Sequence, residues 1–181
     1  SKAFLTQNGR TVYDGGGIKP DVEVDAEQVS DFSKTLVNDL IIFDFATKYA
    51  QDNPNLDWQN FEVDNKVFSD FLEYIEYRDY DVETTTDKKM EDLLASAKND
   101  HFNDKYLNSL KEVKAELKAQ KKELYKTYKT QISAMISDNV IKHFAYNQGV
   151  YQHNIRKADV VKKALEVLSS DKNYSNILNP Q

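Results

Sequence analysis

The stretch at residues 105–148 decides the fold class: it reads KYLNSLKEVKAELKAQKKELYKTYKTQISAMISDNVIKHFAYNQ and contains neither Gly nor Pro. Apolar residues recur in it at steps of three and four, which places them on one face of a helix. The pattern predicts one continuous helix or a helix pair, because Thr127, Thr130 and Ser133 weaken the middle. Gly149 is expected to stop this helix, in the C-terminal position that glycine prefers.

The rest of the chain after residue 24 predicts shorter amphipathic helices, so the fold is expected to be mainly α, a helical bundle. Asp25 and Gln28 form a capping-box pattern ahead of a helix from about Val29 to Gln51. Pro54 ends that helix, because proline cannot continue it. Further caps and helices are predicted at Asp64 with 67–75, at Thr84 with 90–97, and at 160–168, and residues 171–181 are predicted to be a fraying tail.

Residues 1–24 have a different character, because four of the five glycines in the chain lie within the first seventeen residues. Glycine persists where the backbone needs a positive φ or a close approach, so this cluster indicates a system of turns. Asn8-Gly9 predicts a tight turn between strands at about Phe4–Thr6 and Arg10–Tyr13. Val22–Val24 predicts a further half-buried strand. Strands this short need another sheet to pack against, so we expect that sheet to lie outside this chain.

This N-terminal stretch resembles the end of the protease core in the carboxy-terminal processing peptidases, also called tail-specific proteases. Members of that family typically carry a Tyr-Thr-Pro-Ser-Gly-Arg-like segment followed by Gly-x-Gly-Ile-x-Pro-Asp. Gln7 and Asn8 stand where Pro and Ser are common, and Gly16 stands where a charged residue is frequent, but all three keep turn chemistry. The matching residues are Thr6, Gly9, Arg10, Gly15, Gly17, Ile18, Pro20 and Asp21.

The resemblance implies a serine endopeptidase with a Ser/Lys dyad, in which a lysine activates the serine nucleophile. Both residues, and a peptide-binding PDZ module, would precede Ser1, so the chain itself would be inactive. Residues 1–24 would end the protease core, and residues 25–181 would form a C-terminal helical domain with a structural, regulatory or oligomerising role. Its partners would be its own core and PDZ module and the polypeptide substrates, in the periplasm of a bacterial cell envelope, without a cofactor. Arg10 and Asp21 are expected to pair and to pin the glycine turn onto the core.

Composition excludes several classes of function. The 181 residues carry a net charge of -6, which disfavours nucleic-acid binding, because phosphate neutralisation needs a positive surface. The absence of cysteine excludes disulfides and thiolate catalysis, and no apolar run approaches the roughly 18 residues of a membrane span. Residues 25–83 hold 15 acidic and 4 basic side chains, whereas residues 84–181 are net basic. We expect these parts to neutralise each other on a shared surface, and recruitment of a basic polypeptide by the acidic part is the alternative.

No group of residues predicts a catalytic or metal site in this chain. Lys129 and Ser133 lie one helical turn apart, but no oxyanion-hole glycine is near them, so no catalytic role is assigned. The tyrosine-rich stretch 74–80 is interpreted as the edge of a core rather than a recognition surface. The histidines that lack metal-site spacing are His101, His143 and His153.

A second class of function stays open beside the protease. The chain could also be a stand-alone helical scaffold that binds another protein through the acidic, tyrosine-rich region or through the long helical seam. Residues 1–24 would then be no more than a capping hairpin.

Overall fold

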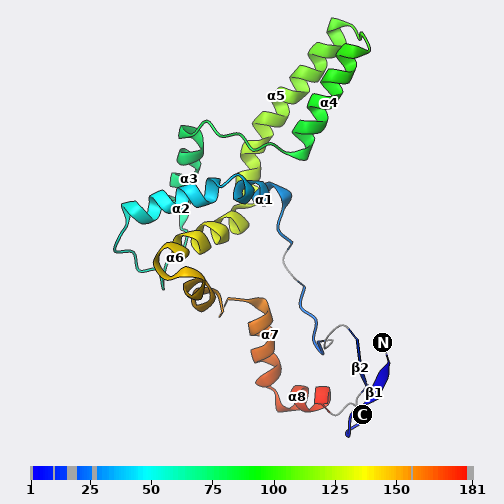
Figure 1. The fold of residues 1–181 in the computed structure, drawn as a ribbon, viewed down its shortest axis with the longest axis vertical. Helices are drawn as coiled ribbons and strands as arrows, with labels where there is room; N and C mark the ends of the chain where they lie inside the picture. The colour runs from blue at the N-terminus through cyan, green and yellow to red at the C-terminus, as the bar shows by residue number, and fades with distance from the viewer. Residues whose placement is uncertain (1, 10, 16–19, 26–27, 156, 179–181) are drawn as a thin grey trace. The chain divides into compact units, whose positions relative to one another are not determined.

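The computed structural model describes residues 2–9, 11–15, 20–25, 28–155 and 157–178 (Figure 1). They form eight helices and one two-stranded antiparallel sheet, which confirms the mainly α fold with a short N-terminal β segment. The chain divides into two compact units: the larger unit is Gln28–Val150, and the smaller unit joins Ser1–Glu27 to Tyr151–Gln181. The predicted domain boundary after residue 24 stays a prediction.

The core of the larger unit is built from helices α1 (Asp31–Asn38), α2 (Ile41–Asp52), α3 (Asn65–Tyr77) and α6 (Lys129–Asn154). Each contributes apolar side chains at helical spacing, as the sequence predicts, and the segment that follows α3 adds Val82. The side chains without solvent contact include Leu36, Ile42, Phe71, Ile132, Ile136, Val140 and Ile141.

The predicted single helix at 29–51 is wrong, because Leu40 separates α1 from α2. Leu40 adopts the left-handed conformation, with φ 61° and ψ 11°, and a helix cannot continue through it. The predicted cap at Asp25 is also wrong: the Ser30 side chain accepts a hydrogen bond from the Ser33 N–H and begins α1. The predicted cap at Asp64 is confirmed, since its carboxylate accepts from the Val67 N–H at 2.8 Å.

The long stretch is a helix pair, which confirms one of the two predicted arrangements: α5 (Asp104–Thr127) ends at Tyr128, and α6 follows. Gly149 does not stop α6, contrary to the prediction. The backbone leaves helical geometry earlier, at Tyr146, with φ 53°. Gly149 is needed for a close approach instead, because a Cβ there would collide with Ala145 and lie 3.3 Å from the Trp58 ring.

Helices α4 (Thr85–Asn99) and α5 form an antiparallel hairpin, here called the arm, which extends from the four core helices in Figure 1. The predicted cap at Thr84 is confirmed as a reciprocal capping box with Asp87. At the other end of α4, His101 is left-handed, with φ 58°, and the Phe102 N–H reaches the Ala97 carbonyl at 3.1 Å. Together with the bond from the His101 N–H to the Lys98 carbonyl, also at 3.1 Å, this bond forms a Schellman motif that turns the chain into α5.

The smaller unit contains the predicted hairpin, formed by β1 (Ala3–Leu5) and β2 (Thr11–Tyr13). Gly9, with φ 76°, occupies the turn and donates to the Thr6 carbonyl at 2.9 Å. Residues 22–24 form no strand, contrary to the prediction. Val22 and Val24 are half-buried and Glu23 is exposed, so the alternation is real, but the apolar side packs toward helices.

The C-terminal part of the smaller unit is α7 (Asp159–Leu168), as predicted, followed by α8 (Asp171–Leu178). The prediction of a fraying tail is therefore wrong for residues 171–178. The Ser170 side chain accepts from the Asn173 N–H at 3.3 Å, which supplies the helix start that the sequence analysis overlooked.

Replacing Leu40 by glycine is expected to stabilise the protein by about 1 kcal/mol, because glycine adopts the left-handed conformation without the steric cost that Leu bears. The Leu40 side chain is 57% exposed, so little packing is lost. Urea unfolding followed by circular dichroism measures the change. Leu40→Ala is the control and should give no comparable gain; a loss of stability in Leu40→Gly would contradict the assignment of strain.

Candidate functional site

The residues of the protease-like motif lie in the smaller unit, where the described ones form turns. Gly9 and Gly15 have φ values of 76° and 85°, so both use the conformational freedom of glycine. Asp21 lines a groove beside α7 and α8. Arg10, Gly17 and Ile18 lie outside the described residues, so the predicted Arg10–Asp21 pair stays a prediction.

The hairpin presents apolar side chains to solvent. Phe4, Leu5 and Tyr13 are 51%, 72% and 57% exposed, and among the described residues the sheet has only the two strands. Two strands alone are marginally stable in water, and unpaired strand edges favour pairing with further strands. The hairpin therefore has the properties of a sheet fragment whose partner is another sheet.

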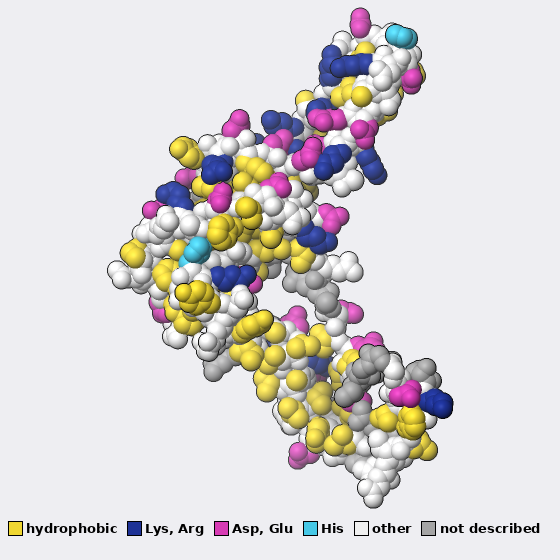
Figure 2. Space-filling view, in the orientation of Figure 1, with side chains coloured by type: hydrophobic (Ala, Val, Ile, Leu, Met, Phe, Trp, Pro, Cys, Tyr) yellow, Lys and Arg dark blue, Asp and Glu magenta, His cyan; other side chains and the backbone are white. Residues whose placement is uncertain are grey.

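Helix α7 carries a second exposed apolar surface. Val160, Leu165 and Leu168 are each about 60% exposed, and Figure 2 shows hydrophobic side chains gathered over α7 and α8. Part of the stripe faces Val22 and Val24 across a groove of about 480 Å³. The smaller unit thus combines exposed strands with an incompletely covered helix.

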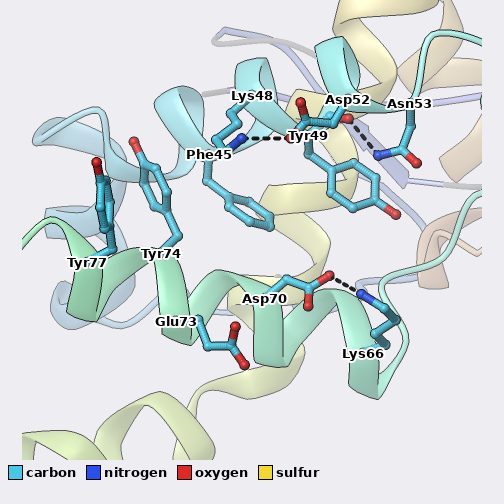
Figure 3. A pocket seen from close by; sticks show the side chains of 10 residues that line it. All are labelled: Phe45, Lys48, Tyr49, Asp52, Asn53, Lys66, Asp70, Glu73, Tyr74 and Tyr77. Carbon is cyan, nitrogen blue, oxygen red and sulfur yellow. Dashed lines mark hydrogen bonds and ion pairs between the residues drawn. The ribbon is translucent and has the colours of Figure 1, made fainter.

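A concave surface lined by polar and aromatic side chains lies in the larger unit, between α2 and α3, and is here called the α2–α3 groove (Figure 3). Its volume is about 560 Å³, within the range of ligand pockets. Helix α2 and its cap place Phe45, Lys48, Tyr49, Asp52 and Asn53 along one wall. Helix α3 places Lys66, Asp70, Glu73, Tyr74 and Tyr77 along the other. The groove is thus lined by aromatic rings together with positively and negatively charged side chains.

Each lysine of the α2–α3 groove is paired within its own helix. Lys48 Nζ lies 2.7 Å from Asp52 Oδ2, and Lys66 Nζ lies 2.7 Å from Asp70 Oδ2, both at i,i+4 spacing. Hydrogen bonds and charges from these aspartates raise the pKa of Lys48 and of Lys66. The lysine charges are therefore largely neutralised in place.

The tyrosine-rich stretch divides between core edge and surface. The Tyr80 hydroxyl donates to Asp39 Oδ2 at 2.6 Å, and burial together with this bond raises its pKa. Tyr74 packs against the core, as the interpretation of a core edge requires. Tyr77 is 87% exposed and departs from it.

A buried ionic cluster surrounds Lys121 at the base of the arm. Its ammonium donates to the Val82 carbonyl at 2.9 Å and lies 2.8 Å from Asp81 and 3.1 Å from Asp87. Burial opposes the charge of Lys121, but the two carboxylates outweigh it and raise the pKa of the ammonium. Every donor direction is used, which indicates a structural role: the cluster fixes α5 to the α3–α4 connection.

Other candidates from the sequence have structural surroundings. Lys129 Nζ donates to Asn65 Oδ1 at 2.6 Å and lies 5.1 Å from the centre of the Phe68 ring. The Lys129 ammonium is therefore bound by residues of α3 and does not act as a base for the Ser133 hydroxyl. The Ser133 hydroxyl is buried without a hydrogen-bond partner in the described part of the chain. His143 contacts Thr47 Oγ1 at 3.1 Å. Within the described ranges, no cluster of three His, Asp or Glu side chains could hold a metal ion.

Ion pairs join the acidic and basic parts of the sequence, as expected from their charges. Lys121 pairs with Asp81, Lys122 with Glu76 at 3.6 Å, and Lys88 with Glu83 at 3.2 Å. None of the helices that the structure describes combines the length and apolar character needed to cross a membrane.

Replacing Lys121 by alanine is expected to lower the free energy of unfolding by about 3 kcal/mol, because two carboxylates lose a buried partner. Chemical denaturation measures this loss. Lys122→Ala is the matched control: Lys122 and Glu76 are about three-quarters exposed, so that change should stay below about 0.5 kcal/mol. Equal effects of the two substitutions would refute the structural role of the cluster.

Asp87 is expected to make the folded state sensitive to acid. Burial disfavours its charge, but hydrogen bonds from Thr84 and the Lys121 ammonium outweigh this effect and lower the pKa of Asp87. A carboxyl whose pKa is lower in the folded state stabilises above its unfolded pKa of about 3.9, and this stability disappears as the pH falls through the folded pKa. The stability difference between the wild type and Asp87→Asn should therefore shrink from pH 5 to pH 2 in urea titrations. A difference that stays constant over this range would show that the charge contributes nothing.

Comparison with known proteins agrees with the resemblance at the N terminus. A family model described as "Probable PDZ-protease, C-terminal helical domain" matches residues 32–168, from α1 to the last residue of α7. Searches among curated proteins and among solved structures gave no match. The family match covers more than half of the chain and includes both walls of the α2–α3 groove. The chain therefore belongs to the family of C-terminal helical domains of probable PDZ-proteases.

Proposed function

We propose that this chain is the C-terminal region of a tail-specific serine endopeptidase, and that it supports the catalytic core without cleaving substrates itself. The observation that carries the proposal is the family match over residues 32–168, which places α1 to α7 in the family of C-terminal helical domains of probable PDZ-proteases. The motif at residues 6–21 supports it, because those residues resemble the end of a Ser/Lys protease core. The nucleophile and its lysine base would then lie on that core, before residue 1, in the bacterial periplasm.

In this proposal, the smaller unit attaches the helical domain to the protease core. The exposed side chains of β1 and β2 would be covered by the sheet of the core, which would also pair the open strand edges. The segment with Val22 and Val24 then continues from the hairpin to the groove beside α7 and α8. One continuous segment, from the hairpin to Val24, would thus connect the strands that join the protease core to helices α7 and α8.

The proposal predicts that chain 1–181 has no proteolytic activity, whereas the intact gene product that contains it cleaves unfolded polypeptides. Release of fluorescent fragments from labelled casein measures both. A PDZ module captures a free C-terminal carboxylate, so an otherwise identical peptide substrate with an amidated C terminus should be cleaved at least tenfold more slowly. Equal cleavage of the free and amidated peptides would contradict tail specificity.

Attachment through the hairpin is tested in the intact gene product with Leu5→Asp. A carboxylate at this position would be buried in the joined sheet, so activity on casein should fall by about tenfold or more. Val113→Asp is the matched control, because Val113 is an exposed apolar residue of the arm, and it should leave activity unchanged. Full activity of Leu5→Asp would show that the hairpin is not part of the core.

A further inference from the structure

The charged side chains that line the α2–α3 groove are three carboxylates, Asp52, Asp70 and Glu73, and two lysines, Lys48 and Lys66. The pKa values of Lys48, Tyr49 and Lys66 are all raised, so the more positive form of each group is favoured. Burial is the main cause of the raised pKa of Tyr49, and the carboxylates of Asp64 and Asp70 raise this pKa further. The groove lies within residues 25–83, the part of the chain with 15 acidic and 4 basic side chains. The groove therefore carries one carboxylate more than it has lysines, in the acidic part of the chain.

One carboxylate of the groove is left without a cation. Asp52 and Asp70 are paired with Lys48 and Lys66, whereas Glu73 makes no ion pair or hydrogen bond within the described ranges. Glu73 lies one helical turn before Tyr77 on α3, so the two side chains are neighbours on its surface. Together they place one negative charge and one exposed ring a helical turn apart on α3, and Figure 3 shows the two side chains directed apart.

The neighbouring tyrosine already binds a cation of this chain. The Arg78 guanidinium carbon lies 5.7 Å from the centre of the Tyr74 ring, and Nη1 donates to the Tyr74 hydroxyl at 3.2 Å. Ring faces attract guanidinium and ammonium groups in this geometry. The ring of Tyr77, which is 87% exposed, has no such partner within the described ranges.

The dimensions of the groove fit a peptide rather than a single ion. Its wall on α3 runs from Lys66 to Tyr77, which is about 16 Å at 1.5 Å per helical residue. An extended peptide of about five residues has this length, at roughly 3.3 Å per residue. Figure 3 shows the tyrosines at one end of this wall and the Lys66–Asp70 pair at the other.

We propose that the α2–α3 groove binds a basic polypeptide segment, with one Arg or Lys side chain held between the carboxylate of Glu73 and the ring of Tyr77. The paired lysines Lys48 and Lys66 flank the segment without repelling it strongly, because Asp52 and Asp70 neutralise them. This site depends only on the larger unit. It is therefore independent of the protease activity, and its test does not require a catalytic core.

The proposal is tested by titrating the ¹⁵N-labelled chain 1–181 with the peptide acetyl-Gly-Ala-Arg-Ala-Gly-amide, whose only charge is the arginine. Amide shifts should saturate and should concentrate on α2 and α3. The same peptide with citrulline, which has the shape of arginine without its charge, should bind at least fivefold more weakly. A peptide with Glu in place of Arg should not bind.

Variants distinguish the site from general attraction by an acidic surface. Glu73→Gln and Tyr77→Ala should each weaken binding of the arginine peptide about fivefold. Glu76→Gln removes the same charge from the same helix outside the groove, and it should change the affinity less than twofold. Equal effects of Glu73→Gln and Glu76→Gln, equal binding of the citrulline peptide, or the absence of shifts on α2 and α3 at 10 mM peptide would each overturn the proposal.

Discussion

The larger unit depends on one apolar stripe of α6, whose residues Ile132, Ile136, Val140 and Ile141 have no solvent contact. The other core helices pack in the same apolar cluster, and each also contacts a residue of α6, or the residue just before it, outside this stripe. The Phe32 ring of α1 stacks on Tyr128 just before α6, Lys129 of α6 lies over a ring of α3, and His143 of α6 contacts the Phe43 ring of α2. Both walls of the α2–α3 groove, α2 and α3, therefore pack against the same core as this stripe.

Much of the fold could be predicted because its signals are local. Helical periodicity, the caps at Asp64 and Thr84, and the Asn8-Gly9 turn each depend on residues close in sequence. Leu40 could not be predicted as a break, because leucine favours helices and no glycine or asparagine in the sequence marks a left-handed residue at this position. Residues 22–24 show the opposite case: their alternation of half-buried and exposed side chains is real, but the apolar side packs toward α7 and α8 instead of another strand.

The candidate site could be predicted only in part. The motif at residues 6–21 identified a protease family from turn residues, and the family match over residues 32–168 agrees. The α2–α3 groove left only two traces in the sequence, the excess of acidic residues at 25–83 and the tyrosines at 74–80. Neither trace shows that Lys48 and Lys66 are neutralised while Glu73 is not, because that distinction follows from side-chain geometry on two facing helices.

The arm has a consequence for how the domain unfolds. Apart from its base at Lys121 and Tyr125, the only buried residue that α4 and α5 contribute among the described residues is Ala97, so the outer arm is held by contacts between its own two helices. Segments with few buried contacts open at a lower free energy than the global transition. Backbone amides of the outer arm should therefore exchange with solvent in a cooperative step of their own, while those of α6 remain protected until the whole unit opens.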